Sequence, residues 1–299
     1  MEGPRHVWVD GRLEPADGTH LSAFDRGFQM GDGVFETLRV RGGRVTEPGE
    51  HVARLRQSAA TLGIEIPPTF ERLLLPAIAE LLAAEGLGGP DGDAAIRITV
   101  SRGSWASRAV LPPPGEAVRP TIVIQAWPAS SPATGRSARA VTLVASSVRR
   151  DPANPLVGIK TTSRAEYVYA RLEARRRGAD DALFLTVSGH LAEATSANLF
   201  LVRAAPDGAT ELATPSLDCA ILAGTTRSWL LRWAVEVGLR PFEGLLTPAD
   251  LAAADEAFLC SSVAGVVPVT RFEDRAVGDG RPGPWTLRAQ ADREAFVAR

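Results

Sequence analysis

A stretch rich in proline, serine, alanine and glycine interrupts the regular succession of apolar segments in this chain. It runs from Pro128 to Arg139, and such a composition is typical of a linker rather than of a helix or a strand. The 299 residues are enough for two modest domains, each with its own core. We therefore predict an N-terminal domain over residues 1–127, an interdomain loop over 128–139 and a C-terminal domain over 140–299.

Helical and strand-like patterns alternate on both sides of this stretch. Residues 33–41 and 94–101 have the β-branched and apolar content that is typical of strands. Apolar positions instead recur at helical spacing over residues 50–62 and over about 70–85, where Pro76 could mark the true start of the helix. In the second part, the same criteria predict helices at 163–177 and 225–237 and strands at 182–187, 198–203, 256–261 and 266–271. Both parts are therefore predicted to belong to the α/β class.

The charge and residue counts argue against several classes of function. Lys and Arg total 33 against 35 Asp and Glu, with a formal net charge of -2, so a protein that depends on many contacts with nucleic-acid phosphates is not expected. Two cysteines and four scattered histidines offer no metal-ligand spacing. The opening sequence MEGPRHVWVD lacks the apolar core of a signal peptide, and no run approaches the roughly 20 apolar residues of a membrane helix. We therefore expect a cytoplasmic protein with no metal, no nucleic-acid partner and no membrane segment.

Lysine is almost absent from the chain. Of the 33 basic residues, 32 are arginine, and the single lysine is Lys160. A GC-rich coding bias accounts for the depletion but not for the exception, because arginine does not supply a primary amine that can deprotonate and act as a nucleophile. Lys160 lies in the segment GIKTTS, between a turn and a predicted helix. A side chain at such a junction can point into a pocket, where burial lowers its pKa; a solvated surface lysine is the ordinary alternative.

Two further segments of the second part carry polar groups that could bind a ligand. Glu193, in HLAEATSANLFLV, could pair with a cation such as a protonated pyridine nitrogen, or with an ordinary arginine. Gly224, Thr225 and Thr226 open a predicted helix, where N–H groups, hydroxyls and the helix dipole can bind an anion. A plain threonine N-cap is the alternative. Ser262, in a separate loop, could add a hydroxyl.

Arginines of the first part could bind the acidic groups of a ligand. Arg54, on the helix predicted over 50–62, could reach a phosphate. A carboxylate could be held in bidentate fashion by one of Arg39, Arg97, Arg102 and Arg108. In a chain with 32 arginines each of these could equally be a surface charge. An amine, a carboxylate for a ring nitrogen and a phosphate cradle are together the equipment of a pyridoxal 5′-phosphate (PLP) enzyme.

Six segments carry a resemblance to a known family. They are FDRGFQMGDGVFETLRV (24–40), HVARL (51–55), GIKTTS (158–163), RGADDALFLTVSGHLAEATSANLFLV (177–202), LAGTTR (222–227) and EAFLCSSVAGVVPV (256–269). In these segments and in their order, the sequence resembles the fold-type IV PLP enzymes, the class IV aminotransferases. That family includes D-amino acid, branched-chain and (R)-amine aminotransferases and aminodeoxychorismate lyase. The resemblance implies an α/β protein with a small N-terminal α/β domain and a larger C-terminal pseudo-barrel domain, assembled as a homodimer or larger oligomer with the active site near the dimer interface.

The resemblance also implies a role for each candidate residue. Lys160 would hold PLP as a Schiff base and then shuttle a proton, and Glu193 would bind the pyridine N1–H. The rest of the cofactor, its phosphate above all, would be held by Arg54, Asn198, Gly224, Thr225, Thr226 and Ser262. The substrate would be bound by Phe35, Thr37, Arg39, Arg97, Arg108, Val263 and Ala264.

Departures from the family patterns bear on the choice of substrate. Branched-chain enzymes usually carry tyrosines where this chain has Ala95 and Ala165, and a glycine where it has Thr37. The opening motif DRGFQMGDGVFE and the arginine-bearing loop 102–108 resemble D-amino acid aminotransferase, in which a loop arginine receives the substrate carboxylate. We therefore expect a transaminase that moves amino groups between D-amino acids, with (R)-amines as further candidates, and 2-oxo acids by a ping-pong mechanism.

Three alternatives stay open. Thr37 and the turn Ser101-Arg102-Gly103 also resemble aminodeoxychorismate lyase, which forms 4-aminobenzoate and pyruvate. A branched-chain L-amino acid aminotransferase is the second alternative. The third is a PLP-binding or oligomeric protein without turnover, or a fold relative that has lost its cofactor.

Overall fold

The computed structural model describes residues 3–129 and 139–299. The predicted interdomain loop, 128–139, therefore lies largely outside the described residues. The described chain divides into two compact units. The first contains residues up to 129 together with Ile159–Arg164, and the second contains 139–158 and 165–299. The segment with Lys160, which the predicted boundaries put in the C-terminal domain, thus packs with the first unit.

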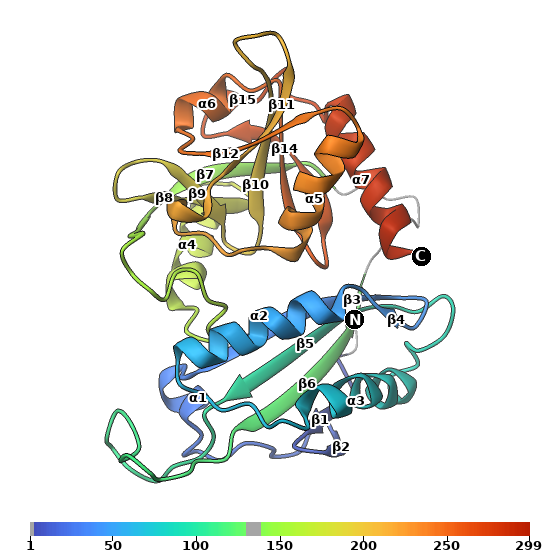
Figure 1. Cartoon of the computed structure of the whole chain (residues 1–299), viewed down its shortest axis with the longest axis vertical. Coiled ribbons are helices and arrows are strands. Elements are labelled where there is room, and N and C mark those ends of the chain that lie inside the picture. The colour runs from blue at the N-terminus through green and yellow to red at the C-terminus, as the bar shows by residue number, and fades with distance from the viewer. Residues whose placement is uncertain (1–2, 130–138) are drawn as a thin grey trace. The chain divides into compact units, whose positions relative to one another are not determined.

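The first unit is built on one antiparallel sheet of six strands, drawn in blue to green in Figure 1. Its order is β2-β1-β6-β5-β3-β4. The strands are β1 (His6–Val9), β2 (Arg12–Pro15), β3 (Gly33–Arg41), β4 (Arg44–Val45), β5 (Asp93–Ser101) and β6 (Thr121–Pro128). The helices are α1 (Arg26–Met30), α2 (Pro48–Thr61) and α3 (Phe70–Ala84).

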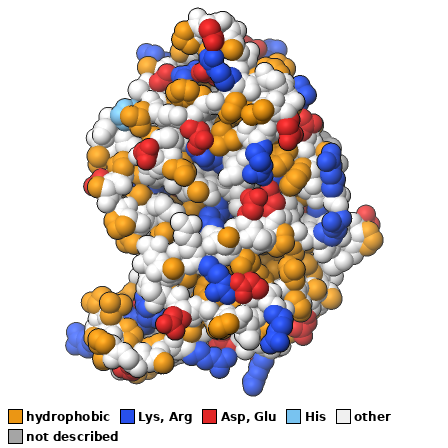
Figure 2. All heavy atoms as spheres, in the orientation of Figure 1, with side chains coloured by type: hydrophobic (Ala, Val, Ile, Leu, Met, Phe, Trp, Pro, Cys, Tyr) orange, Lys and Arg blue, Asp and Glu red, His pale blue; other side chains and the backbone are white. Residues whose placement is uncertain are grey.

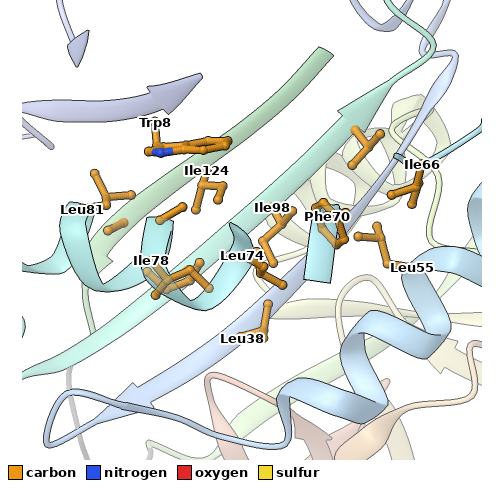
Figure 3. Packing of buried hydrophobic residues seen from close by; sticks show 14 of the residues in the cluster. Trp8, Leu38, Leu55, Ile66, Phe70, Leu74, Ile78, Leu81, Ile98 and Ile124 are labelled. Atoms are coloured by element: carbon orange, nitrogen blue, oxygen red, sulfur yellow. The ribbon is translucent and has the colours of Figure 1, made fainter. Parts of the chain in front are cut away.

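The alternation of side chains along β3 and β5 gives this sheet two different faces. One face packs under α2 and α3 and contributes Leu38 and Ile98 to a buried apolar core that also contains Leu74 of α3 and Leu55 of α2 (Figure 3). Successive strand residues point to opposite faces, so the other face carries the alternate positions of the two strands. Those positions include Phe35, Thr37, Arg97 and Thr99, and the register places Phe35 opposite Thr99 and Thr37 opposite Arg97. The candidate substrate residues of the two strands therefore share the face away from the core.

Pro76 does not mark the start of the third helix, contrary to the sequence prediction. The helix begins at Phe70 and Pro76 lies inside it. A proline there removes one intrahelical hydrogen bond, but Leu74 and Ile78 on either side are buried in the core. Packing of the apolar face therefore maintains the helix through the proline.

The second unit contains a sheet of nine strands that closes on itself (Figure 1). The path is β12-β11-β10-β13-β14-β7-β8-β9, and β9 also pairs with β10. The strands are β7 (Val141–Arg150), β8 (Asp181–Thr186), β9 (Leu191–Ala194), β10 (Asn198–Ala204), β11 (Thr210–Pro215), β12 (Arg240–Gly244), β13 (Glu256–Ser261), β14 (Gly265–Phe272) and β15 (Arg275–Ala276), which pairs with β14. The β9–β10 pairing completes a ring of six strands, so the predicted α/β class with a pseudo-barrel in the C-terminal part is confirmed.

Helices and a short 3₁₀ turn complete the second unit. They are α4 (Ala165–Arg176), the 3₁₀ turn η2 (Leu217–Cys219), α5 (Thr225–Glu236), α6 (Pro248–Ala252) and α7 (Pro284–Val297). Helices α5 and α7 cover β13 and β14 through a core that includes Trp233 and the stacked rings of Phe200 and Phe258, whose centroids are 5.5 Å apart. The strand ends that carry Glu193, Asn198 and Ser261 are thereby anchored to a packed interior.

Surface charge, metal-ligand groups and helix length are further features that bear on function. On the face seen in Figure 2, basic and acidic side chains are interspersed rather than gathered into a patch of one sign. Within residues 3–129 and 139–299, no group of His, Cys, Asp and Glu is arranged to hold a metal ion. No helix in the described part of the chain has the length and apolar character needed to cross a bilayer.

Candidate functional site

The segment that contains Lys160 is bound to the edge of the first sheet. The short strand β4 pairs only with Val40 and Arg41, the last residues of β3, so the edge of β3 near Gly33 is available to another segment. Phe35 N–H donates to the Lys160 carbonyl at 2.9 Å, and Thr162 N–H donates to the Gly33 carbonyl at 2.9 Å. These main-chain bonds fix the lysine beside β3, although it is more than 100 residues distant along the chain.

Glycine is required where this segment meets β3. A Cβ atom on Gly33 would lie 2.9 Å from the Val100 carbonyl oxygen and 3.1 Å from Thr162 Oγ1. The Thr162 hydroxyl donates to the Gly31 carbonyl at 2.7 Å. Gly31 and Gly33, which lie in the segment FDRGFQMGDGVFETLRV, therefore allow the lysine segment to approach closely.

Three cationic side chains surround the ring of Phe35. Arg97 Cζ lies 3.8 Å from the ring centroid, Lys160 Nζ 4.8 Å and Arg164 Cζ 5.7 Å. Burial, together with the positive charge of Arg164, lowers the pKa of Arg97 below its usual range. Besides the Phe35 ring, the contact of Arg97 is to the Thr99 hydroxyl, which accepts from Nε at 3.3 Å. A half-buried pair of guanidinium groups beside an amine favours the approach of an anion such as a carboxylate.

The other candidate arginines of the first unit differ from Arg97 in their hydrogen-bond partners and in their exposure. Arg39 is 1% exposed, and its Nε and Nη2 donate to the two carboxylate oxygens of Asp93 at 2.6 and 2.8 Å. Arg102 donates to Asp32 and to the Leu62 carbonyl at 2.6 Å. Both arginines are thus occupied in holding the fold, which argues against the substrate role predicted for Arg39 and the carboxylate clamp considered for Arg102. Arg108 is exposed in the loop between β5 and β6.

Arg54, predicted to bind the phosphate, belongs to a buried charged cluster. Its Nε and Nη2 each donate to Glu36 at 2.7 Å, and His51 Nδ1 lies 2.7 Å from Glu36 Oε2. The Glu36 side chain is 0% exposed and that of His51 1%. Burial raises the pKa of Glu36, but the hydrogen bonds from Arg54 and His51 outweigh it and lower the pKa to about 2. Glu36 therefore stays ionised and fixes the plane of the Arg54 guanidinium.

In the second unit, Glu193 lies at the end of β9 and is 6% exposed. Its Oε2 accepts from Asn198 Nδ2 at 3.2 Å and from Leu222 N–H at 3.1 Å. Asn198 Nδ2 also donates to the Leu222 carbonyl at 3.0 Å. The guanidinium of Arg150 lies 3.8 Å from Glu193 Oε1. Three neighbours thus contact the carboxyl group of Glu193 and fix its orientation.

The Leu222 loop leads directly into a cradle for an anion at the start of α5. Gly224 is the N-cap and has no side chain with which to cap the first turn, so the helix end can accept an anion. The hydroxyls of Thr225 and Ser262 are 3.2 Å apart. A Cβ on Gly224 would lie 2.1 Å from Asn198 Oδ1, so glycine is required for the loop to pack on Asn198. Behind the cradle, the buried Arg293 donates to the Thr226 hydroxyl at 3.4 Å, which adds positive charge.

The remaining substrate candidates lie in the turn after Ser262. Val263 is half-buried and Ala264 is exposed, and Ala264 N–H donates to the Ser261 hydroxyl at 3.3 Å. Within the second unit, the structure thus groups Glu193 and Asn198 with the start of α5, and it groups Thr225 with the loop of Ser262. Within the first unit it groups Phe35, Arg97 and Lys160.

These donor sets fit PLP part by part. A pyridinium N–H requires a carboxyl group that accepts its hydrogen bond, for which Glu193 is suited by its position. A phosphate requires N–H groups, hydroxyls and positive charge, which the start of α5 supplies with Thr225, Ser262 and Arg293. An aldehyde requires a primary amine, which only Lys160 can supply among the side chains of the chain.

Sequence reasoning missed three of the contributing residues. Glu36 and His51 lie on the predicted strand and helix but were not connected with Arg54. Arg164, in the Phe35 cluster, directly follows the GIKTTS motif and carried no signal of its own. The His51-x-x-Arg54 spacing puts both side chains on one helix face, and this was the available signal for the buried cluster.

Comparisons with known proteins agree with this chemistry. The family model described as "Amino-transferase class IV" matches residues 33–272. Aminodeoxychorismate lyase of Vibrio harveyi is 32% identical over 88% of this chain and 90% of the relative, and D-alanine aminotransferase of Bacillus licheniformis is 28% identical over 95% and 94%. A branched-chain amino acid aminotransferase of T.th., solved with pyridoxamine 5′-phosphate, superposes with a TM-score of 0.87 at 28% identity, covering 100% of this chain and 95% of that one.

Proposed function

Because the chain belongs to the class IV aminotransferase family, a family of PLP-dependent enzymes, we propose that it is a transaminase that moves the amino group between D-amino acids and 2-oxo acids. The observation that carries this proposal is the cluster on Phe35. A single primary amine, Lys160, and the guanidinium of Arg97 both contact the ring of Phe35, so the proposed reacting amine and carboxylate receptor belong to one cluster. (R)-Amines are further candidate donors.

The choice of D-amino acids is supported by features of the sequence. A D-alanine aminotransferase aligns along 95% of the chain, and the loop between β5 and β6 presents Arg108 to solvent. Ala95 and Ala165 stand where the branched-chain enzymes usually have tyrosine. A pocket that lacks these two rings would have room for a different arrangement of the substrate side chain.

In the proposed reaction, each candidate residue would have a separate role in binding or in proton transfer. Bound PLP would supply an aldehyde carbon for an amine and a ring that takes up an electron pair. Glu193 would hold a proton on the ring nitrogen, and Thr225, Thr226, Ser262 and Arg54 would hold the phosphate. Lys160 Nζ would take the proton from the substrate Cα and pass it to the former aldehyde carbon, which requires that the amine be neutral for part of the cycle. Arg97 would bind the substrate carboxylate and so orient the Cα–H bond toward the amine.

A half-reaction screen tests this proposal. Purified enzyme loaded with PLP is mixed with D-alanine, D-glutamate, L-leucine or an (R)-amine, and the absorbance of the bound cofactor is followed without an acceptor. We expect the absorbance to change with D-amino acids and the matching 2-oxo acid to appear in equal amount. If no D-amino acid changes the spectrum while L-leucine does, the enzyme is a branched-chain aminotransferase and the D-specific proposal is wrong.

A lyase is the second candidate function. The relative from Vibrio harveyi, named aminodeoxychorismate lyase, is 32% identical, and Thr37 lies opposite Arg97 on the sheet face with Phe35. The same proton abstraction by Lys160 followed by elimination would release pyruvate. Pyruvate released from aminodeoxychorismate with no amino acceptor present would identify the lyase, because a transaminase needs the acceptor to turn over.

A homodimer in the cytoplasm completes the proposal. Apolar side chains in and just before α1 and on the loop between β5 and β6 are exposed, and exposed apolar groups of this kind favour a protein partner; they are Leu21, Phe24, Phe28, Met30, Val110 and Leu111. The buried Arg26 links the two segments by donating to the Ala109 carbonyl at 3.2 Å. Cys219 and Cys260 are free and buried, as a reducing compartment allows. Light scattering should give twice the 31.7 kDa chain mass; a monomer at micromolar concentration would contradict the dimer.

A further inference from the structure

Arg150, the last residue of β7, is a buried charge that makes fewer hydrogen bonds than a buried guanidinium normally does. It is 1% exposed, and among the described residues the Tyr167 side chain is a partner but Nε and Nη2 are left without one. Burying an arginine is costly unless its charge is compensated. The compensation therefore has to come from whatever surrounds the guanidinium.

Two aromatic rings enclose the guanidinium. Its Cζ lies 4.5 Å from the centroid of Tyr167 and 4.4 Å from that of Phe184. Tyr167 is on α4 and Phe184 on β8, and their rings meet edge to face at 5.4 Å. Such a cage stabilises a cation through the faces of the rings and restricts the directions in which its N–H groups can point.

The two terminal nitrogens of the Arg150 guanidinium each face a carboxylate. Nη2 lies 3.8 Å from Glu193 Oε1, and Nη1 lies 3.4 Å from Glu166 Oε1. The Glu166 side chain is 42% exposed and that of Glu193 8%. Water therefore screens the pair Arg150–Glu193 less than the pair Arg150–Glu166. Glu193 is thus the carboxylate that interacts more strongly with the charge of Arg150. Burial works against the charge of Arg150, but Tyr167 and Glu193 raise the pKa of Arg150 above its usual range.

Arg150 and the neutral donors around Glu193 face different oxygens of its carboxyl group. Asn198 and Leu222 donate to Oε2, whereas Arg150 faces Oε1. A carboxylate in a buried site with neutral donors alone tends to take up a proton, because burial disfavours its charged form. A neighbouring guanidinium opposes this.

We propose that Arg150 is a positioning residue that keeps Glu193 ionised, so that Glu193 rather than solvent controls the proton on the ring nitrogen of PLP. The inference rests on the proposed function, because it assigns Arg150 a part in cofactor chemistry through Glu193. Arg150 does not need to touch cofactor or substrate for this role.

The first experiment uses the protein without added PLP. The glutamate side-chain carboxyl carbons are labelled with ¹³C, the Glu193 signal is identified by its loss in Glu193→Gln, and the signal is followed from pH 5 to pH 9. In the unaltered protein we expect no titration of Glu193 in this range. In Arg150→Gln we expect its titration midpoint to rise by about one pH unit or more and to enter the range. Arg150→Lys, which keeps the charge, should restore the flat profile.

Arg149 supplies the matched control. It precedes Arg150 on the same strand but is exposed, so Arg149→Gln removes the same charge from the chain without changing the surroundings of Glu193. Its Glu193 signal should behave as in the unaltered protein. If Arg150→Gln lowers the melting temperature but leaves the Glu193 signal flat, Arg150 has only a structural role and the proposal is overturned.

The second experiment keeps the proposal testable if Arg150→Gln does not fold. Glu166→Gln alters a half-buried position of α4 and removes the competing carboxylate from Arg150. In protein loaded with PLP labelled with ¹⁵N in the ring, we expect the ring nitrogen to lose its proton at a different pH from that in the unaltered protein, because the full charge of Arg150 then acts on Glu193. No change in that profile would overturn the proposal. Neither measurement requires turnover, so a failed half-reaction with D-amino acids would refute the proposed function alone.

Discussion

The guanidinium of Arg54 and the carboxylate of Glu36 form a two-point ion pair with both hydrogen bonds at 2.7 Å. Glu36 belongs to the core-facing side of β3, where its neighbours Val34 and Leu38 are apolar and 0% exposed. A charged residue at such a position is tolerated because Arg54 and His51 satisfy both of its oxygens. The pair therefore connects the core of the first unit with the arginine predicted to bind phosphate.

Glu36→Gln should destabilise the protein strongly. The substitution leaves the charge of Arg54 without its buried partner, and breaking a buried pair in this way costs about 3–5 kcal/mol. Urea unfolding followed by circular dichroism would measure the loss. Glu71→Gln is the matched control, because Glu71 also pairs with an arginine, Arg56, but at the exposed surface. The control should lose less than about 1 kcal/mol, and equal losses in both variants would contradict the account.

The same ion pair predicts how stability depends on acid. Glu36 has an ordinary pKa of 4.5 when unfolded and a pKa of about 2 when folded. As the pH falls below 4.5, Glu36 therefore takes up a proton in the unfolded chain but not yet in the folded protein. The contribution of Glu36 to stability is complete above pH 4.5 and is lost as the pH falls toward 2. Unfolding free energies of the unaltered protein should fall across this window more steeply than those of Glu36→Gln; parallel curves would argue against the low pKa.

Arg97→Ala should separate substrates that carry a carboxylate from those that do not. A hydrogen bond between charged groups contributes about 1.5–3 kcal/mol, so kcat/KM for D-amino acids should fall by about 10- to 100-fold. Donor amines without a carboxylate should be affected little. Arg72→Ala, at an exposed position of α3, serves as the control and should change neither. An equal loss with both kinds of donor would show that Arg97 does not read the carboxylate.

Gly224→Ala should weaken the binding of PLP without unfolding the protein. The φ of Gly224 is -71°, which alanine adopts readily, but the new Cβ would lie 2.1 Å from Asn198 Oδ1. Asn198 is held by Glu193 and Leu222, so the loop has to move away from it. Strain of about 1–3 kcal/mol should raise the dissociation constant of PLP by about tenfold or more. Gly49→Ala, where a Cβ meets nothing within 4 Å, should leave PLP affinity unchanged.

Local patterns predicted the elements that are formed by local rules. The strands β3 and β13 and the helices α2 and α5 were found because their apolar residues recur with the period of the element. Strand β12 was missed because Arg240–Gly244 is mostly exposed, contains Pro241 and becomes a strand only through its parallel pairing with β11. That pairing joins segments about 30 residues apart, and no local pattern carries it.

The candidate site likewise contains residues that the sequence alone indicates and residues that only the fold indicates. Lys160 and Glu193 stood out because of residue scarcity and motif, and their roles stay predictions until tested. Arg150 is one of 32 arginines, and nothing in its local sequence distinguishes it from the exposed Arg149. Its enclosure by Tyr167 and Phe184 depends on the packing of α4 against β7 and β8, which only the fold supplies.

The most direct test of the central claim is to find which residue bonds to PLP. The protein loaded with PLP is treated with borohydride, which makes the bond to the amine permanent, then digested and analysed by mass spectrometry. We predict one modified site, Lys160, and no modification of that peptide in Lys160→Arg, because guanidinium stays protonated and does not form the bond. Lys160 is the only lysine in the chain, so the N-terminal amine is the remaining competitor. A protein that binds PLP tightly but carries the label at the N-terminus, or carries none, would contradict the assignment of Lys160.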